Sequence, residues 1–258
     1  MTGPRVLVTR PQAQAAAWVA ELQAEGLPAV ALPLIEIAAL EDDAPLRTAW
    51  RQLSTRAFVM FVSANAVEAF FASRPDGVAW PTGTQAGATG PGTVAALRQA
   101  GVPAACLRAP AADAPSFDAE ALWAVVAREP LARWQGARVL VVRGEEGREW
   151  LAERFREHGA EVDYLAAYRR IEPPWSSEES AACDAALARP EAHVWLFSSS
   201  EAVHNLRGLR PAADWSRSRA VATHARIAAA ARGLGFGSVA VCAPLPRAVV
   251  EAARTFPA

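Results

Sequence analysis

The chain has 258 residues, of which 52% are hydrophobic and 21% are charged, and its formal net charge is −1. This is the composition of an ordinary globular protein, and it lacks the strongly basic balance expected of a nucleic-acid-binding protein. The sequence opens "MTGPRVLVTRP" and goes directly into an apolar run, and no apolar stretch reaches 18 residues without a charge. We therefore expect no signal peptide and no membrane span, and we expect the protein in the cytoplasm.

The cysteines and histidines give no sign of a metal site. The three cysteines lie far apart, and none belongs to a Cys-x-x-Cys pair. The four histidines lack the short spacings of zinc ligands. We expect small buried cysteines in a reducing compartment, no metal ion and no cofactor.

Short apolar runs alternate with helix-period segments along the whole chain. We predict strands near residues 5–9, 29–38, 58–62, 85–89, 104–107, 138–142, 161–170, 193–197, 219–223 and 238–242, with helices between most of them. This alternation is typical of α/β proteins, in which helices flank both faces of a parallel sheet. A glycine, Gly26 or Gly159, closes two of the predicted helices as a C-terminal cap.

The chain contains an internal repeat of about half its length. "RVLVTRPQAQAAAWVAELQAEGLPAV" at 5–30 resembles "RVLVVRGEEGREWLAERFREHGAEV" at 138–162. "FVSANAV" at 61–67 resembles "FSSSEAV" at 197–203, and "ATGPGTVAALRQAG" at 88–101 resembles "ATHARIAAAARGLG" at 222–235. The three pairs keep their order at offsets of 133 to 136 residues. They indicate a duplicated unit that is too long for a solenoid repeat, and the chain length also favours two domains.

The polar turns that follow the predicted strands hold the candidate binding residues. The carboxyl ends of parallel strands share one edge of a sheet, and ligands of α/β proteins gather there. Each turn opens a helix, whose unpaired N–H groups and dipole favour an anion, although a serine or threonine there can also be a simple N-cap. Together with the arginines, the turns indicate a ligand with several carboxylates or phosphates. They contain Arg10, Ser63, Thr93, Arg143, Arg148, Ser198, Ser199, Thr223 and Arg226.

A dinucleotide-binding motif is formally present but poorly placed. "GPGTVA" at 90–95 fits G-x-G-x-x-A, and Asp113 follows it. The motif does not lie in the first βα unit, and Pro91 removes one N–H group from the turn. A nucleotide-dependent oxidoreductase is therefore a weaker alternative than a non-enzymatic two-domain protein that binds an anionic metabolite.

Several motifs together resemble the uroporphyrinogen-III synthase family. They are "VLVTRP" at 6–11, "LPLIEI" at 32–37, "FVSANAV", the G-x-x-T turn at 90–93, "RGEEGREWL" at 143–151 with "YRR" at 168–170, "FSSSEAV", and "THARIA" at 223–228. The resemblance extends from residue 6 to about residue 250. It implies a hydro-lyase of heme biosynthesis that takes hydroxymethylbilane, a linear tetrapyrrole with eight carboxylates. The enzyme would remove water, invert the last pyrrole ring and close the macrocycle to uroporphyrinogen III.

The resemblance also implies two similar flavodoxin-like α/β domains with parallel sheets flanked by helices, joined by a two-strand linker. Residues 1–37 and 172–258 would form one discontinuous domain, and residues 38–171 an inserted second domain. The sequence pattern alone would instead favour a simple cut near residue 133. We expect a monomer that binds its small-molecule substrate but neither nucleic acid nor membrane.

The resemblance assigns roles where the motifs match. Tyr168 of "AAYRR" corresponds to the family's cleft tyrosine and is the catalytic candidate, assisting departure of the hydroxyl, although it can equally be an aromatic residue packed between domains. The threonine and serine turns correspond to substrate contacts, and the arginines to clamps for acetate or propionate groups, or to partners of carboxylates in their own domain. At one turn this chain has Thr223-His224, and so departs from a version of the turn with two threonines that occurs elsewhere in the family.

We expect formation of uroporphyrinogen III to survive exhaustive chelation and to need no added nucleotide. The reasons are the missing metal-ligand spacings and the poor placement of "GPGTVA". Turnover of hydroxymethylbilane before and after dialysis against EDTA measures this. Recovery of activity only after addition of zinc, magnesium or NAD would contradict it.

Overall fold

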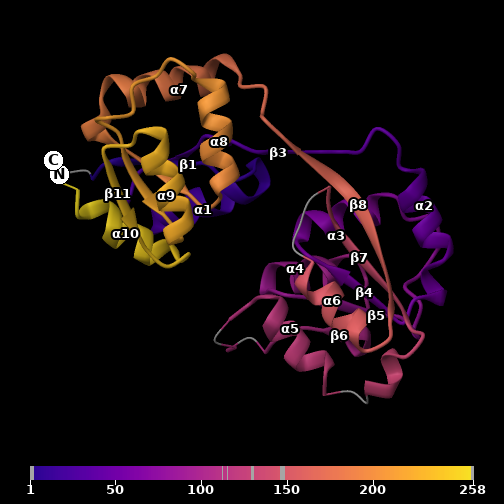
Figure 1. Cartoon of the computed structure of the whole chain (residues 1–258). Helices are drawn as coiled ribbons and strands as arrows, with labels where there is room; N and C mark the ends of the chain where they lie inside the picture. Colours follow the sequence, from indigo (N-terminus) through magenta and orange to yellow (C-terminus); the bar gives the residue numbers. More distant parts are fainter. Residues whose placement is uncertain (1–2, 112, 115, 129–130, 146–148, 257–258) are drawn as a thin grey trace. The chain divides into compact units, whose positions relative to one another are not determined.

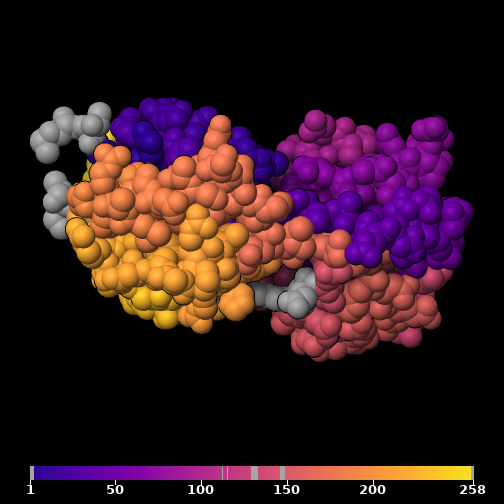
Figure 2. Space-filling model, turned by 90° about the horizontal axis from the view of Figure 1, so that it is seen from above, coloured from indigo at the N-terminus to yellow at the C-terminus, as the bar shows by residue number. Residues whose placement is uncertain are grey.

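The computed structural model describes residues 3–111, 113–114, 116–128, 131–145 and 149–256. The chain forms two compact units: unit 1 comprises Met1–Glu36 and Ile171–Ala258, and unit 2 comprises Ile37–Arg170. A simple cut near residue 133 is wrong, because that position lies inside unit 2. The chain leaves unit 1 and returns to it, so the N-terminal segment, indigo in Figure 2, packs in unit 1 with the orange and yellow C-terminal part.

Unit 1 is a five-stranded parallel sheet in the order β11-β10-β9-β1-β2, with helices on both faces (Figure 1). On one face α1 contacts α10, and on the other α8 contacts α9. The strands are β1 (Arg5–Val8), β2 (Ala29–Ala31), β9 (His193–Phe197), β10 (Arg219–Ala222) and β11 (Ser238–Val241). The helices are α1 (Gln12–Ala24), α7 (Ser177–Ala188), α8 (Ser200–Leu209), α9 (Ala225–Leu234) and α10 (Pro246–Arg254), with a 3-10 turn at Pro190–Ala192.

Unit 2 has a six-stranded sheet in the order β3-β8-β7-β4-β5-β6, parallel from β8 to β6. The contacts of α3 with α4 and of α5 with α6 repeat the arrangement of unit 1. The strands are β3 (Glu36–Ala38), β4 (Phe58–Phe61), β5 (Gln85–Ala88), β6 (Leu107–Arg108), β7 (Arg138–Gly144) and β8 (Glu161–Ile171). The helices are α2 (Ala44–Arg51), α3 (Ala64–Ala72), α4 (Pro91–Gln99), α5 (Ala119–Val126) and α6 (Trp150–Glu157), with 3-10 turns at Leu53–Thr55, Ala104–Cys106 and Leu131–Trp134. The predicted α/β fold with parallel sheets flanked by helices is confirmed.

The alternation of side chains along each strand divides the core of unit 2 into two clusters. Phe61 and Val142 lie on the face covered by α2, α3 and α4. Phe58 and Val141 point to the opposite face, where Phe155 of α6 packs against the Phe58 ring at a centroid distance of 5.3 Å. Because both faces are covered, these strands are apolar at almost every position rather than at every second one.

Two expected strands are shorter in the structure. The strand expected at 29–38 is two strands, β2 and β3, which belong to different sheets because the chain passes from unit 1 to unit 2 here. Between them, the Pro33 carbonyl accepts a hydrogen bond from the indole of Trp175 at 2.8 Å. The segment expected as a strand at 104–107 is mostly a 3-10 turn that begins after Pro103. The other predicted strands are confirmed to within two residues.

The cysteines largely match the expectation. All three are outside disulfides; Cys106 and Cys183 are buried, whereas Cys242 is half-buried. Burial raises the pKa of the Cys183 thiol to about 11, so this thiol is protonated near neutral pH and packs as a small hydrophobe. Among the described residues, no helix is long and apolar enough to cross a membrane.

The two predicted cap glycines, Gly26 and Gly159, have φ angles of 79° and 86°. We expect Gly26→Ala to lower the free energy of unfolding by about 1–2 kcal/mol, because a Cβ in the left-handed region crowds the carbonyl oxygen. Gly233→Ala is the matched control, since Gly233 lies inside α9 with no atom within 4 Å of an added Cβ. It should raise stability by about 0.5–1 kcal/mol. Urea unfolding measures both; a loss of the same size in both variants would contradict the backbone explanation.

Candidate functional site

In unit 2 the predicted site residues meet at the carboxyl edge of the sheet. Ser63 follows β4, and Thr93 lies in the first turn of α4, which follows β5. Arg143 lies at the end of β7, and Tyr168 lies near the end of β8. Since β8, β7, β4 and β5 are neighbours in this order, the four residues come from adjacent strands. The fold therefore gathers residues that are remote in the sequence.

The hydroxyl groups of Tyr168 and Ser63 contact each other. Tyr168 Oη and Ser63 Oγ are 3.3 Å apart, and either group can be the donor. Ser63 is also the N-cap of α3, where its Oγ accepts a hydrogen bond from the N–H of Ala66 at 3.2 Å. Tyr168 is 3% exposed and belongs to the core cluster beneath α2, α3 and α4. The phenol is thus held by unit 2 itself and ends in a hydroxyl pair.

A β-bulge in β8 decides the face to which Tyr168 points. The register with β7 is regular up to Arg143, but the next pair is Gly144 with Tyr168, which leaves Ala167 as an extra residue. By strict alternation Tyr168 would lie on the same face as Tyr164, four residues earlier. Because the bulge inserts one residue, the ring of Tyr168 turns to the opposite face and enters the other core cluster.

Arg143 reaches the same edge on the opposite face of the sheet. Its guanidinium lies 4.1 Å from the centroid of the Tyr164 ring, and the guanidinium of Arg156 lies 5.3 Å from that centroid. This cation–π arrangement holds Arg143 half-buried on the α6 side of the sheet. The structure therefore places Arg143 near the strand end, as predicted, but not beside Tyr168. Arg148, the next predicted clamp, lies outside the described residues.

The turn before α4 presents backbone N–H groups. Its N-cap is Gly90, which has no side chain to cap the helix, and Pro91 occupies the first helical position. The N–H groups of Gly92 and Thr93 therefore have no side-chain cap and are suited to an anion. Thr93 as a whole is buried, with 6% exposed, whereas Gly92 before it is exposed. The N–H group of Gly92 is consequently more accessible to a ligand than Thr93 is.

In unit 1 the remaining candidates lie at the equivalent edge. The turns after β1, β9 and β10 adjoin one another because these strands are neighbours in the sheet. Ser199 caps α8, since its Oγ accepts the N–H of Glu201 at 3.2 Å. The structure brings together Arg10, Ser198, Ser199, Thr223 and Arg226 at this edge, the last with its side chain exposed.

His224 acts as a helix cap. Its Nδ1 accepts a hydrogen bond from the N–H of Arg226 at 3.1 Å at the start of α9, and its side chain is exposed. A threonine hydroxyl at this position could accept the same bond. The departure of Thr223-His224 from a double threonine therefore preserves the capped turn.

Arg10 is a partly buried cation. Its guanidinium lies 4.6 Å from the centroid of the Trp18 ring and donates a hydrogen bond to Gln14 Oε1 at 3.3 Å. Burial lowers the pKa of this guanidinium below its usual value, although arginine stays charged in proteins. Its buried Nε has no hydrogen-bond partner among the described residues. Neither contact is a carboxylate, so Arg10 can still pair with an acid group of a ligand.

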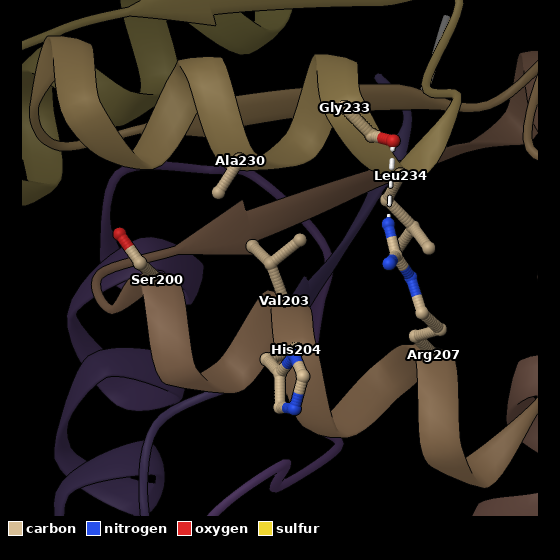
Figure 3. Close-up of a pocket in the computed structure, with 7 residues that line it drawn as sticks. All are labelled: Ser200, Val203, His204, Arg207, Ala230, Gly233 and Leu234. Carbon is tan, nitrogen blue, oxygen red and sulfur yellow. Dashed lines mark hydrogen bonds between the residues drawn. The ribbon is translucent and has the colours of Figure 1, made fainter.

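A groove between α8 and α9 begins next to Ser199. Figure 3 shows Ser200 and Ala230 at one end and Arg207 at the other, where its guanidinium donates to the Gly233 carbonyl at 3.4 Å. The Ser200 Oγ is buried and has no hydrogen-bond partner in the described part of the chain. The groove has a volume of about 280 Å³ and is lined by Ser200, Val203, His204, Arg207, Ala230, Gly233 and Leu234. The groove arises from the packing of two helices and not from a motif, so no pattern in the sequence indicates it.

Comparison with known sequences identifies relatives along most of the chain. The family model of uroporphyrinogen-III synthase HemD matches residues 16–247. A uroporphyrinogen-III synthase from Salmonella typhimurium is 29% identical over 251 residues, covering 92% of this chain and 94% of the relative. One from Proteus mirabilis is 32% identical over 177 residues, covering 68% and 85% of the two chains.

Solved structures agree at the level of the fold. A mutant uroporphyrinogen III synthase from Thermus thermophilus matches with a TM-score of 0.54 at 18% identity, covering 97% of this chain and 98% of that one. A uroporphyrinogen-III synthetase from Helicobacter pylori matches with a TM-score of 0.53 at 16% identity, covering 98% and 99%. Because the family model matches most of its length, the chain belongs to the uroporphyrinogen-III synthase family.

Proposed function

We propose that Tyr168 assists the chemical step of the enzyme, which closes hydroxymethylbilane to uroporphyrinogen III with inversion of the last pyrrole ring and loss of water. The observation that carries the proposal is the 3.3 Å contact between the hydroxyls of Tyr168 and Ser63 at the carboxyl edge of unit 2. The bulge in β8 turns the phenol toward this contact, and the core cluster holds its ring. A fixed hydroxyl donor at a ligand-binding edge is the feature that this reaction needs.

The chemistry requires a group that helps a hydroxyl to leave. The pyrrole nitrogen of the first-reacting ring supplies the electron pair, the C–O bond breaks, and an azafulvene cation forms. A hydrogen bond from Tyr168 Oη to the departing oxygen would stabilise the charge that develops there. A proton lost from the pyrrole carbon after ring closure balances the proton that leaves with water. In this scheme Ser63 orients the phenol through the hydroxyl pair.

The substrate carries eight carboxylates, and the second role of the protein is to hold them. In unit 2 we assign carboxylate contacts to the uncapped N–H groups near Thr93, to Ser63 and to Arg143 and Arg148. In unit 1 we assign them to Arg10, Ser198, Ser199, Thr223 and Arg226. Arginine forks and helix N-termini both suit carboxylates, and each charge-assisted hydrogen bond contributes about 1.5–3 kcal/mol. Holding one folded conformation favours closure with inversion over direct closure to the wrong isomer.

We also propose that residues 1–37 with 172–258 and residues 38–171 are the two domains, and that the enzyme works as a monomer in the cytoplasm. In the part of the chain that the structure describes, few large hydrophobic residues are exposed, which suits a monomer; they are Val78, Phe117, Ile171, Val241 and Leu245. Three thiols outside disulfides suit a reducing compartment. Size-exclusion chromatography with light scattering tests the monomer. The alternative of a non-enzymatic binding protein has no observation in its favour.

We expect Tyr168→Phe to lower the rate of formation of isomer III by about 10- to 1000-fold, the range for loss of one positioned donor. The phenyl ring keeps the packing, so the melting temperature should stay within a few degrees. Affinity should change little, because the carboxylate contacts remain. The assay supplies enzymatically generated hydroxymethylbilane and separates isomers I and III by chromatography. Wild-type turnover with unchanged stability would return Tyr168 to a purely structural role.

We expect Ser63→Ala to slow isomer III formation and also to lower stability by about 0.5–2 kcal/mol, because α3 loses its N-cap. Asp118→Ala is the matched control, since Asp118 caps α5 in the same unit by accepting the N–H of Ala121 at 2.8 Å. It should lose similar stability and keep the wild-type rate. Equal rates in the two variants would show that Ser63 contributes only its cap.

A further inference from the structure

The backbone conformation at Gly144 does not require a glycine. It is not one of the described glycines with positive φ, so its conformation is open to any residue. It is buried at the end of β7, where a larger side chain would normally add apolar contacts. A glycine in a buried strand lowers the stability of the strand, and it often marks a place where another group comes close.

The ring of Tyr168 occupies that space. A Cβ added to Gly144 would lie 3.2 Å from both Cε2 and Cζ of Tyr168 and 3.5 Å from Oη. Contacts of 3.2 Å are tighter than nine in ten Cβ contacts in proteins, so the ring would have to shift by a few tenths of an ångström. The atoms that would be pushed are those at the hydroxyl end of the side chain.

The hydroxyl contact tolerates little displacement. Tyr168 Oη and Ser63 Oγ are already 3.3 Å apart, beyond the usual 2.5–3.0 Å of O–H···O bonds. The bulge at Ala167 sets the face of the ring, and Gly144 lies opposite the ring in the neighbouring strand. The position of Oη is therefore set by one extra residue in β8 and one missing side chain in β7.

We infer that Gly144 is a positioning residue: by lacking a side chain it allows the bulge in β8 to set the Tyr168 hydroxyl in its reactive place. The inference rests on the proposed role of Tyr168 and adds a residue that touches no substrate. It differs from a packing role in one respect, namely that the effect of Gly144 on turnover must pass through the Tyr168 hydroxyl.

The test is a double-mutant cycle. Gly144→Ala should lower kcat by about 3- to 10-fold with little change in KM, since a misplacement of about 1 Å can cost about 100-fold and the expected shift is smaller. In the Tyr168→Phe background the same substitution should leave kcat unchanged, because the hydroxyl it displaces is absent. The measurements are kcat and KM for isomer III formation, with the folded fraction of each variant determined by circular dichroism.

Gly87→Ala is the matched control for packing strain. Gly87 is a buried glycine in β5 of the same unit, and an added Cβ would overlap the ring of Phe58 on the strand β4. This variant should lower the melting temperature without changing the kcat of the folded fraction. If Gly144→Ala does not fold, Ala167→Gly replaces it: this change adds no atom but loosens the bulge, and it should likewise lower kcat only when Tyr168 is present.

Three results would overturn the inference. The first is wild-type kcat for Gly144→Ala, or for its replacement Ala167→Gly, while Tyr168→Phe is slow; the role of Tyr168 would then stand and that of Gly144 would not. The second is independent, multiplying effects in the double mutant, which would show that Gly144 acts elsewhere. The third is wild-type kcat for Tyr168→Phe, which would remove the proposed catalytic role together with this inference.

Discussion

The central strands of both sheets are buried on both faces, and that constraint decides where the chemistry of this protein can be. Strands such as β4 and β9 are buried at every residue, so a polar side chain within them needs a partner in the protein. His193, at the first position of β9, has one, because its Nδ1 lies 2.9 Å from the Arg189 carbonyl oxygen. Polar groups are therefore displaced to the strand ends, where a turn and a helix N-terminus can satisfy them. Ser63 and Ser199 occupy such places, each as the N-cap of the following helix. The same N-termini that need a cap offer hydrogen bonds to a carboxylate.

Much of this could be predicted from the sequence, because it follows from local rules. Apolar runs predicted the strands. Gly26 and Gly159 predicted the ends of two helices, because the residue after a helix often has a positive φ, which favours glycine. Parallel strands then require the following turns to share an edge, which is why Ser63 and Thr93 could be assigned to one site. Tyr168, 105 residues from Ser63, was assigned to it through the resemblance to the family. The limit of local rules appears at the crossing of the chain between units, since no local signal distinguishes it from a simple cut near residue 133.

The details of the site depend on register, which the sequence does not display. A one-residue bulge moves Tyr168 to the opposite face of the sheet, and nothing in the sequence "LAAYRR" indicates that Ala167 is an extra residue in the strand. Arg143 lies in β7 before the bulge, where the side chains still alternate regularly. It therefore stacks on Tyr164 and lies on the opposite face of the sheet from the Tyr168 phenol. The one available signal was Gly144, a glycine at the end of a buried apolar strand. Its meaning becomes clear only when the facing ring is known.

The two units of the repeat share the features that suit an anion, but they differ at the position of Tyr168. Both copies retain the features that suit an anion, namely an arginine after the first strand and a serine cap, so Arg10 and Ser199 have counterparts in Arg143 and Ser63. At the offset of 133 residues that relates β1 to β7, however, the counterpart of Tyr168 is Ile35, which is buried and has no hydroxyl. Duplication thus repeated features that suit a carboxylate in both units, whereas the hydroxyl pair lies in unit 2, where Ser63 of the first copy meets Tyr168 of the second. An enzyme whose substrate has many equivalent acid groups but one reacting carbon needs that asymmetry, since binding can be shared between units and bond cleavage cannot.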